Sequence, residues 1–476
     1  MATNNSKRRF WFKMITIPGA ILALYFLLIA VFLWNNPQIK WDWDEVDVSE
    51  IDFSGDFTWG VAAAAHQVEG NNTNNQWYLW ETAKDEQGNP RILNGQKAGM
   101  ACDHWNRYPE DIRLMKNLGV TAYRFSIEWS RIEPAESVFD TVAIKHYLQV
   151  CDSLLYHGIK PMITLHHFSN PIWFEKKGAF EKAENVDDFI EFVEYVYPIF
   201  SSRVKNWCTI NEPSVYVVDG YFNGVNPPGV SDPKIAGTVL RNLLEAHVRA
   251  YQMIKSLPGG ADASVGLVKN MTFIDPYNPL NLADWILSSY ANRAFNESTL
   301  NFLETGKFNF VMPTMVKIKE ENPLAVGSTD FIGLNYYSHY TLKFGFDLDN
   351  AFENRPLAHE IPTDMEYSQY PEGFYRAAKR VAKLGVPVIV TENGIADASD
   401  QYRDLFIRRY LYALSKAREE GVDIRGYYYW SLMDNFEWSS GYDMKFGLYE
   451  NNFETQKRRL RGGAEAFREI IIQCAN

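Results

Sequence analysis

Cysteine is scarce in this chain, with four residues among 476, at Cys102, Cys151, Cys208 and Cys474. No two of them form a CxxC pair or a metal-binding spacing, so the sequence predicts neither a disulfide scaffold nor a cysteine-bound metal. The four are interpreted as buried free thiols or incidental surface thiols. Basic residues are also in deficit, with 47 Lys and Arg against 59 Asp and Glu. Because nucleic-acid binding needs a basic face that displaces counterions from phosphates, no nucleic-acid partner is expected.

Glycine-rich phosphate loops are missing as well. No GxGxxG motif follows a strand-like run, which argues against a dinucleotide cofactor, and no cofactor is expected. Aromatic residues, by contrast, are abundant: 14 Trp, 27 Tyr and 30 Phe. With 46% hydrophobic residues, this composition excludes disorder for most of the length. A high aromatic content together with an excess of acidic residues is compatible with a sugar-binding cleft. It is equally compatible with a large aromatic core.

The sharpest compositional break lies at the amino terminus, where residues 14–34 carry no charge. As a helix they would span about 31 Å, close to the hydrocarbon thickness of a bilayer. Four basic residues precede this run and four acidic residues follow it within 13 residues, namely Lys7, Arg8, Arg9 and Lys13, then Asp42, Asp44, Glu45 and Asp47. The positive-inside rule then predicts a cytoplasmic segment 1–13, a transmembrane signal anchor 14–34 and a juxtamembrane linker 35–52.

Two alternatives compete with an uncleaved anchor. A cleaved signal peptide would have a shorter apolar region ending in a small-x-small site, whereas this run exits through large residues and Pro37. A buried core helix is the third interpretation. The favoured one is a single-pass membrane protein with a cytoplasmic amino terminus and an extracytoplasmic catalytic domain.

From residue 57 onward the chain repeats one pattern, a short apolar run followed by a loop and an amphipathic helical stretch. Eight such runs occur, at residues 57–65, 122–129, 160–167, 206–213, 264–271, 330–337, 386–394 and 424–432. Apolar strands separated by helices predict a parallel sheet covered on its outer face. Eight units indicate an α/β protein with a closed (β/α)8 TIM barrel. No linker divides it, so residues 53–476 are predicted to form a single catalytic domain.

Polar side chains gather where these runs end, which is the edge that carries the active site in such barrels. Glu212 ends the fourth run and Glu392 the seventh, each inside otherwise apolar sequence. Cleavage of a glycosidic bond uses two carboxyl groups that face one cleft, of which one is protonated and the other ionised. A separation of roughly 5–5.5 Å gives retention, and a wider gap gives inversion.

Two further strand-end features allow alternative interpretations. His166 and His167 are adjacent on a strand, so their side chains point to opposite faces and no mononuclear metal site is expected. Glu128 fits either a substrate contact or a structural ion pair with Arg124 or Arg131.

These residues lie in motifs that resemble glycoside hydrolase family 1, the β-glucosidase family, over residues 53–470. The motifs are AHQVEG (65–70), YRFSIEWSRIEP (123–134), TLHHFSNPIW (164–173), TINEP (209–213), FIGLNYYS (331–338), VTENG (390–394) and YWSLMDNFEWSSGYDMKFGLYE (429–450). The resemblance implies that Glu212 is the acid/base and Glu392 the nucleophile of a retaining mechanism. It also implies that Arg124 and Tyr337 contact Glu392 and keep it ionised.

The resemblance further implies a set of sugar-binding residues, to which Asn335 at the end of the sixth run is added: Gln67, His167, Asn211, Asn335, Trp430, Glu437 and Trp438. An anionic Glu437 would repel a 6-phosphate, so unphosphorylated sugars are expected. One departure concerns the aglycone side, because Ser214 stands where family members commonly carry Trp.

The leading prediction is therefore a retaining exo-β-glycosidase acting on the non-reducing end of β-glucosides, with β-galactosides and β-fucosides as further candidates. A membrane-associated transglycosidase that moves the sugar to a sugar or glycolipid hydroxyl is the alternative. A non-catalytic sugar-binding ectodomain is disfavoured, since both carboxylates are present. The expected partners are a small β-glycoside and the membrane, while the oligomeric state, the physiological substrate and the host membrane stay open.

Overall fold

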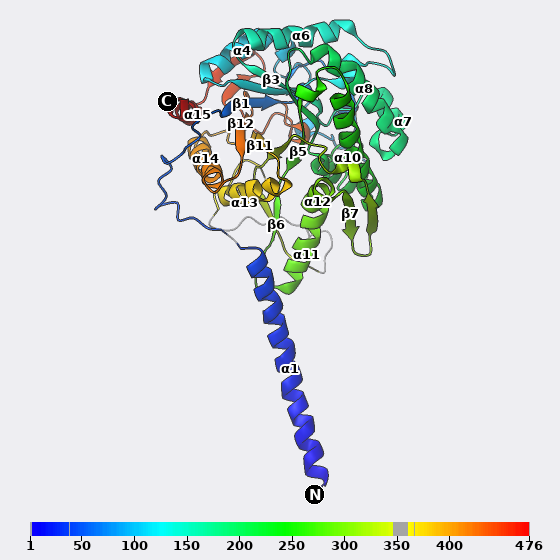
Figure 1. Cartoon of the computed structure of the whole chain (residues 1–476), viewed down its shortest axis with the longest axis vertical. Helices are drawn as coiled ribbons and strands as arrows, with labels where there is room; N and C mark the ends of the chain where they lie inside the picture. The colour runs from blue at the N-terminus through cyan, green and yellow to red at the C-terminus, as the bar shows by residue number, and fades with distance from the viewer. Residues whose placement is uncertain (1, 38, 346–359, 366, 476) are drawn as a thin grey trace.

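The computed structural model describes residues 2–37, 39–345, 360–365 and 367–475. Its centre is a closed barrel of eight parallel strands in the order β1-β12-β11-β9-β5-β4-β3-β2 (Figure 1). The strands are β1 (Thr58–Ala63), β2 (Ala122–Ser126), β3 (Lys160–His166), β4 (Asn206–Asn211), β5 (Ser264–Asn270), β9 (Phe331–Asn335), β11 (Val388–Asn393) and β12 (Ile424–Trp430). Each lies within one of the eight predicted runs, so the (β/α)8 barrel is confirmed.

Helices cover the outside of the barrel and give the sheet its second apolar layer. They are α4 (His104–Leu118), α6 (Thr141–Tyr156), α8 (Val186–Phe200), α10 (Pro233–Ser256), α13 (Pro371–Val381), α14 (Arg403–Glu419) and α15 (Glu465–Ala475). Local sequence explains their starts: the Asp140 carboxylate accepts from the backbone N–H groups of Val142 and Ala143 at the start of α6. Because both faces of the sheet are covered, nearly every residue of the barrel strands is buried.

Short elements decorate the barrel. Short helices are α2 (Ala65–Val68), α3 (Gln76–Thr82), α5 (Trp129–Ile132), α7 (Ile172–Lys177), α9 (Pro213–Val217), α11 (Leu282–Asn292) and α12 (Ser298–Thr305). Three two-stranded sheets complete the set: β6 (Phe273–Pro276) with β10 (His339–Leu342), β7 (Lys307–Met312) with β8 (Val316–Glu321), and β13 (Tyr449–Asn452) with β14 (Lys457–Leu460). All four cysteines are free thiols, and three of them are buried, which agrees with the interpretation of the sequence.

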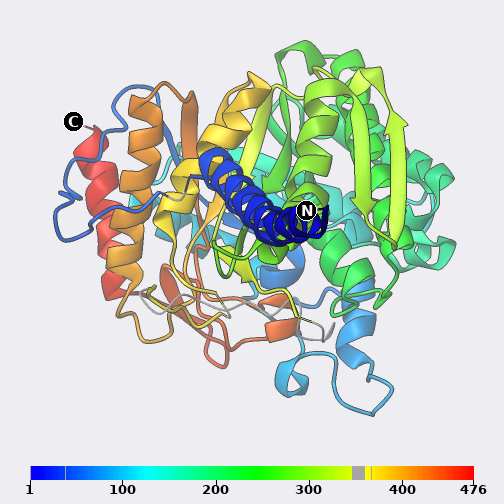
Figure 2. The ribbon, with the colours of Figure 1, turned by 90° about the horizontal axis from the view of Figure 1, so that it is seen from below.

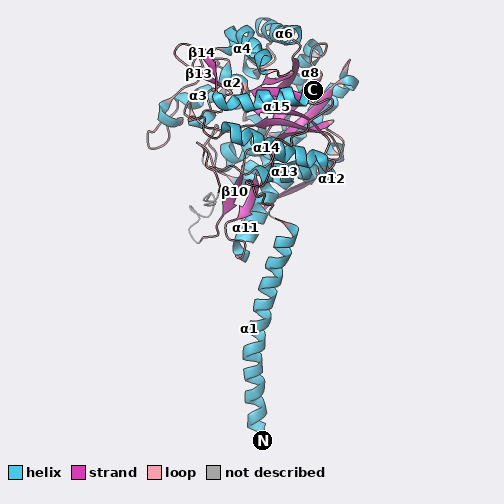
Figure 3. Cartoon of the chain, turned by 90° about the vertical axis from the view of Figure 1, so that its left-hand side faces the viewer, coloured by secondary structure: helices cyan, strands magenta, loops and turns pink. Residues whose placement is uncertain are grey.

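A single long helix, α1 (Ala2–Asn35), projects from the barrel domain (Figures 1 and 3). Viewed from below, it is seen nearly end-on in front of that domain (Figure 2). Its segment Thr16–Asn35 is long and apolar enough to cross a membrane, and only 6% of its most apolar window is buried. A core helix would be largely buried, so this exposure argues against the third interpretation, while an anchor and a signal sequence both fit.

The segment after α1 packs on the barrel instead of hanging free as a linker. The Glu372 carboxylate on α13 accepts from the Trp41 backbone N–H and from the Trp43 indole N–H, each at 3.0 Å. The Trp41 ring also meets Tyr412 of α14 edge to face, with centroids 5.6 Å apart. Two tryptophans therefore fix the exit of α1 against the outer helices.

Candidate active site

The two strand-end glutamates meet at one point of the barrel mouth, and Asn335 connects them. In the sheet, Asn335 of β9 is the register partner of Glu392 on β11. Its side-chain Nδ2 also donates to Glu212 Oε1 at 2.8 Å. Glu212 follows β4 with a left-handed backbone (φ 44°), which turns its side chain into the mouth as the chain enters α9. The strand-end pattern of the sequence therefore located both groups of one cleft.

Glu392 is held by a cation and a hydroxyl. Arg124 Nη1 donates to Glu392 Oε1 at 2.6 Å, and the Tyr337 hydroxyl donates to Oε2 at 2.8 Å. Arg124 is itself fixed, because its Nε donates to Thr164 Oγ1 at 3.0 Å and its Nη2 to Asn211 Oδ1 at 2.7 Å. A positive charge and donated hydrogen bonds both stabilise the ionised carboxylate, although Glu392 is only 4% exposed.

Among the described residues, the hydrogen-bond partners of the Glu212 carboxyl group are neutral. The amides of Asn335 and Asn270 donate to its Oε1 at 2.8 and 3.0 Å. Burial raises the pKa of Glu212 to about 8, and the negative charge of Glu392 adds to the increase, while the two amides lower it in part. At neutral pH this carboxyl group therefore holds a proton.

One protonated and one ionised carboxyl group thus share a buried cleft. A buried carboxylic acid near neutrality can donate its proton to a leaving oxygen, and a desolvated carboxylate can attack a carbon centre. This division of labour is the one that glycosidic-bond cleavage requires.

Around Glu392 and the neighbouring Glu437 lie an imidazole and two amides, those of His167, Asn211 and Gln67. His167 Nε2 is 3.9 Å from Glu392 Oε1 and 3.0 Å from Asn211 Nδ2. Burial lowers the pKa of His167 well below its ordinary value, so the ring is neutral. Gln67, on α2, donates from Nε2 to the Phe436 carbonyl at 2.8 Å and to Glu437 Oε2 at 3.1 Å. Within the described residues, His167 Nδ1 and Gln67 Oε1 are buried without a hydrogen-bond partner, so both atoms are available to a polar ligand.

Aromatic rings form the apolar wall of the cleft. The Trp438 and His167 rings lie 6.2 Å apart at an interplanar angle of 29°, and Trp430 lies 5.9 Å from the same imidazole. Beyond Trp438, a small hollow is lined by Trp77, Phe168, Val215, Tyr216, Asn226 and Pro227. Ser214 is buried beside Thr299, with the two hydroxyl oxygens 3.4 Å apart. The hollow therefore takes its aromatic wall from α3, the β3 loop and α9, and none of it from position 214.

Glu437 differs in charge from the sequence expectation. Burial raises its pKa to about 8, with a further contribution from the charge on Glu392, so the group is largely protonated at neutral pH. Exclusion of a phosphosugar then rests on the cost of bringing a phosphate into this buried pocket, more than on repulsion by an anionic Glu437.

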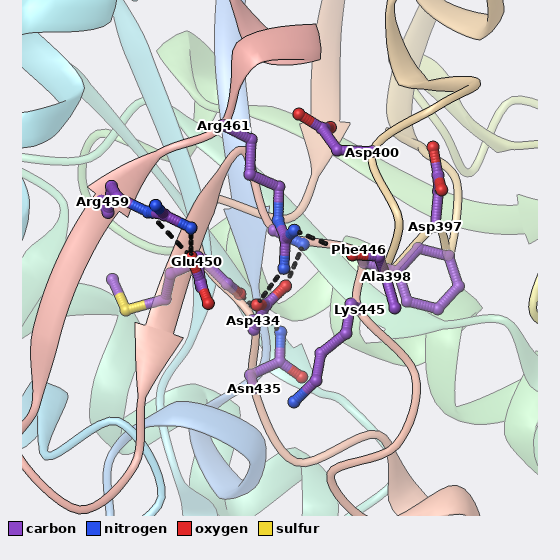
Figure 4. Close-up of polar contacts among 12 residues, drawn as sticks. Asp397, Ala398, Asp400, Asp434, Asn435, Lys445, Phe446, Glu450, Arg459 and Arg461 are labelled. Carbon is purple, nitrogen blue, oxygen red and sulfur yellow. Dashed lines mark hydrogen bonds and ion pairs between the residues drawn. The ribbon is translucent and has the colours of Figure 1, made fainter.

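An ion pair between Arg461 and Asp434 holds the start of the loop that carries Glu437 and Trp438; Figure 4 shows this pair. The buried Asp434 carboxylate binds Arg461 Nη2 at 2.7 Å and accepts from the Gly447 backbone N–H at 2.9 Å. A second pair, Arg459 with Glu450, lies at the surface beside it. Since a buried ion pair is far less screened than an exposed one, the Arg461–Asp434 pair is the one that fixes the loop.

Two alternatives raised by the sequence are resolved by the contacts. His166 points away from His167: its Nε2 lies 2.9 Å from Asn170 Oδ1, and its ring packs against Phe180 and Tyr216. Among the described residues there is no group of three His, Cys, Asp or Glu side chains that could hold a metal ion. Glu128 accepts from the hydroxyls of Ser130 and Ser169 at 2.6 and 2.8 Å, and Arg131 pairs with Glu69 instead. The proposed ion pairs of Glu128 were therefore wrong.

Sequence reasoning missed Asn270, which holds Glu212 directly. The available signal was its position, because it ends the fifth predicted strand as Asn211 and Asn335 end the fourth and sixth. Thr164, which fixes Arg124, gave no comparable signal, because threonine is an ordinary strand residue.

Comparisons with known proteins agree with this geometry. A family model described as glycosyl hydrolase family 1 matches residues 49–475. The chain belongs to glycoside hydrolase family 1. Beta-glucosidase A of Thermotoga maritima is 33% identical over 447 residues, which cover 88% of this chain and 97% of the relative. Beta-glucosidase 25 of rice is 31% identical, covering 90% and 95%.

Solved structures of the family show the same architecture. A beta-glycosidase from Pyrococcus horikoshii is 38% identical with a TM-score of 0.78, covering 88% of this chain and 95% of that one. The Thermotoga maritima enzyme in complex with glucoimidazole has a TM-score of 0.80 at 31% identity, covering 89% and 99%. This family 1 chain is therefore a β-glucosidase-like glycoside hydrolase, a retaining exo-hydrolase built on a TIM barrel.

Proposed function

We propose that this family 1 enzyme hydrolyses the β-glycosidic bond at the non-reducing end of unphosphorylated β-glucosides by double displacement. The observation that carries the proposal is the contrast between Glu392, bound to Arg124 Nη1 at 2.6 Å, and Glu212, whose pKa is about 8. Glu392 is assigned as the nucleophile and Glu212 as the acid/base. Arg124 and Tyr337 keep the nucleophile ionised and oriented.

In the first step, a Glu392 carboxylate oxygen attacks the anomeric carbon while Glu212 gives its proton to the departing aglycone oxygen. One carbon–oxygen bond breaks and an ester bond to Glu392 forms, which inverts the anomeric centre. Glu212 is left as a carboxylate, and the aglycone leaves as a neutral alcohol.

In the second step, Glu212 takes a proton from a water molecule whose oxygen attacks the same carbon. The ester bond to Glu392 breaks, the centre inverts again, and the product retains the β configuration. The negative charge returns to Glu392 beside Arg124, where the buried cation stabilises it.

The sugar is assigned to the group of residues around His167 and Trp430. His167 Nδ1 and Gln67 Oε1, which have no partner among the described residues, are suited to sugar hydroxyls. Asn211, Asn335, Glu437 and Trp438 complete the predicted contacts. The hollow lined by Trp77 and Phe168 supports an aryl or otherwise apolar aglycone.

Glucosides are favoured, with galactosides and fucosides as further candidates. Relatives named as beta-glucosidases support the first choice. Complexes of the Thermotoga maritima enzyme with glucoimidazole and with a galacto-hydroximolactam support tolerance at carbon 4 in the family fold.

The amino-terminal helix is proposed to anchor the enzyme in a membrane. In this assignment residues 1–13 are cytoplasmic, 14–34 span the bilayer, 35–52 connect, and the catalytic domain 53–476 is extracytoplasmic. The exposed apolar surface of Thr16–Asn35 and the basic residues before it support this orientation.

The test of both catalytic assignments is a pair of matched variants with azide as an external nucleophile. Glu392→Gly is expected to lose hydrolysis of a nitrophenyl β-glucoside, and azide is expected to restore turnover with α-glucosyl azide as product, since only one inversion remains. Glu212→Gly with azide is expected to give β-glucosyl azide, because the ester with Glu392 still forms.

Product configuration, read by proton NMR, separates the two roles. Wild-type enzyme with azide is the control and yields β-glucose. Unchanged hydrolysis in Glu392→Gly, or the same azide anomer from both variants, would defeat the assignment.

A further inference from the structure

The carboxyl-terminal half of α1 is docked on α11 of the catalytic domain. The Tyr25 hydroxyl donates to the Leu280 carbonyl at 2.7 Å and accepts from the Leu282 backbone N–H at 3.3 Å. Seven residues further on, about two helical turns, the Phe32 ring stacks on Trp285 with centroids 5.3 Å apart and an interplanar angle of 14°. Figures 1 and 3 both show α11 beside the upper end of α1. The barrel therefore meets the apolar helix along its side and not only through the chain connection.

These contacts place α11 at the level of the membrane-spanning segment. Tyr25 lies ten residues before Asn35, the last residue of the apolar segment Thr16–Asn35. Ten helical residues correspond to about 15 Å along the helix axis. If Thr16–Asn35 crosses the hydrocarbon layer, the start of α11 lies below the membrane surface by up to that distance.

The surface of α11 suits this position because it presents apolar side chains and no charge. Leu280 is 59% exposed and Ile286 is 46% exposed, and Phe344 beside them is 45% exposed. Residues 277–292 contain a single charged residue, Asp284, which is fully buried. Its carboxylate accepts from the Asn278 and Phe344 backbone N–H groups at 3.0 and 2.8 Å, so its charge faces inward.

The flanking residues are those found at bilayer boundaries. Tyr277 and Tyr340 are 37% and 38% exposed, and tyrosine is enriched at the level of lipid headgroups. Lys343 Nζ lies 5.7 Å from the Tyr277 ring centroid, and a lysine there can extend its ammonium group to the headgroup region.

We propose that residues 277–286 and Phe344 form a membrane-insertion surface that, together with α1, seats the barrel in the outer part of a lipid bilayer. This inference rests on the proposed membrane anchor and extends it to the catalytic domain. The occupant is the boundary between headgroups and acyl chains, because the same patch is already in contact with the segment that spans the hydrocarbon.

The proposed membrane-insertion surface is close to the catalytic residues along the chain. Asn270, which holds Glu212, ends β5, and β6 and then α11 follow it within 12 residues. β6 pairs with β10. Along the chain, β9 is followed by Tyr337 and then by β10. The two strands that supply partners of both candidate catalytic groups therefore continue directly into the membrane-facing elements.

The experiment uses the full chain, with Cys474→Ser as background, reconstituted in phosphatidylcholine vesicles. A single cysteine at Leu280 or Ile286 carries an environment-sensitive fluorophore, and lipids with a nitroxide on the acyl chain act as quenchers. Leu22, 57% exposed on α1, reports the anchor, and Val142, 74% exposed on α6, is the matched water-facing control. Retained nitrophenyl-glucosidase activity shows that each labelled protein is folded.

We expect nitroxide lipids to reduce the emission at 280 and 286 by about twofold or more, since an inserted face lies roughly 5–10 Å deep. Emission at 142 is expected to stay unchanged. Quenching at 22 but not at 280 or 286 would overturn the insertion surface and leave the anchor standing. Absence of quenching at 22 as well would overturn both proposals. Protection of 280 from aqueous iodide without nitroxide quenching, together with a dimeric mass, would assign the patch to a second copy of the chain instead.

Discussion

The two glutamates at the barrel mouth lie in regions that bury them to a similar degree but differ in the charge of their hydrogen-bond partners. Glu392 and Glu212 each end a barrel strand, and they are 4% and 6% exposed. The region around Glu392 supplies a guanidinium and a phenol, whereas the region around Glu212 supplies two neutral amides. Desolvation acts on both, so the charge of the nearest partner decides which group keeps its proton.

This difference teaches that the cleft creates two chemically distinct groups from one residue type. Arg124 satisfies one carboxylate, and that carboxylate then raises the pKa of the other. The asymmetry is therefore self-reinforcing. Three substitutions test it from the largest expected effect to the smallest.

Removing the cation should abolish the asymmetry. Arg124→Met leaves Glu392 buried without its ion pair, and loss of such an electrostatic partner costs about 10²–10³ in kcat. We expect this loss in nitrophenyl β-glucoside hydrolysis at pH 7, because the buried carboxylate loses the cation that stabilises its negative charge and holds it in place.

Arg131→Met is the matched control, since Arg131 pairs with Glu69 away from the mouth. It should lower thermal stability and leave kcat within about threefold, because its partner does not take part in the reaction. Equal losses of kcat in the two variants would show that Arg124 acts on folding alone.

Removing one hydrogen bond from Glu392 should also lower kcat, but by less than the loss of Arg124. Tyr337→Phe deletes the hydroxyl that donates to Glu392 Oε2 at 2.8 Å. A hydrogen bond to a charged group contributes about 1.5–3 kcal/mol, so kcat should fall roughly 10- to 100-fold. The basic limb of the pH profile should stay in place, because the Tyr337 hydroxyl donates to Glu392 and not to Glu212.

The neighbouring Tyr336 provides the control, because its hydroxyl donates to the Tyr370 carbonyl at 2.8 Å and touches neither glutamate. Tyr336→Phe should leave both limbs of the pH profile in place. Movement of the basic limb in Tyr337→Phe would contradict the assignment of Tyr337 to the nucleophile.

Removing one hydrogen bond from Glu212 should shift the basic limb of the pH profile. The Asn270 amide lowers the pKa of Glu212, which stands at about 8, so Asn270→Ala should raise it. The general acid must be protonated to act. The value of kcat/KM is therefore high below this pKa and falls as the pH rises through it. We expect the basic limb to move upward by about one pH unit, the worth of one charged hydrogen bond, in a profile of kcat/KM against pH.

A basic limb that stays in place, or moves downward, would show that Asn270 does not act on Glu212. Comparison with Tyr337→Phe sharpens the result, since each variant removes one hydrogen bond from one carboxyl group. Of the two substitutions, only Asn270→Ala should move the basic limb.

Much of this site could be predicted because its information is local. Glu212, Glu392, Asn211, Asn335 and Trp430 are recognisable as polar or aromatic residues at the ends of apolar runs. In a parallel barrel every strand ends at the same edge, so such residues converge without any knowledge of packing. The motifs then favoured a particular division of roles.

Other features could not be predicted because they depend on elements far apart in the chain. The protonation of Glu437 arises from its burial beside Glu392, and the hydroxyl partners of Glu128 replace the ion pair that its neighbours suggested. The packing of Trp41 and Trp43 on α13 and α14 has no periodic signature, since it joins residues more than 300 positions apart.

The sequence by itself determined the order of the eight strands, the edge at which the polar residues meet and the apolar character of the first helix, because strand period and hydropathy are written in neighbouring residues. Only the tertiary structure decided which amides hold Glu212, that burial beside Glu392 raises the pKa of Glu437, and that α11 lies against the apolar helix. Charge states and docking depend on dielectric surroundings and contacts that exist only after distant segments have packed together.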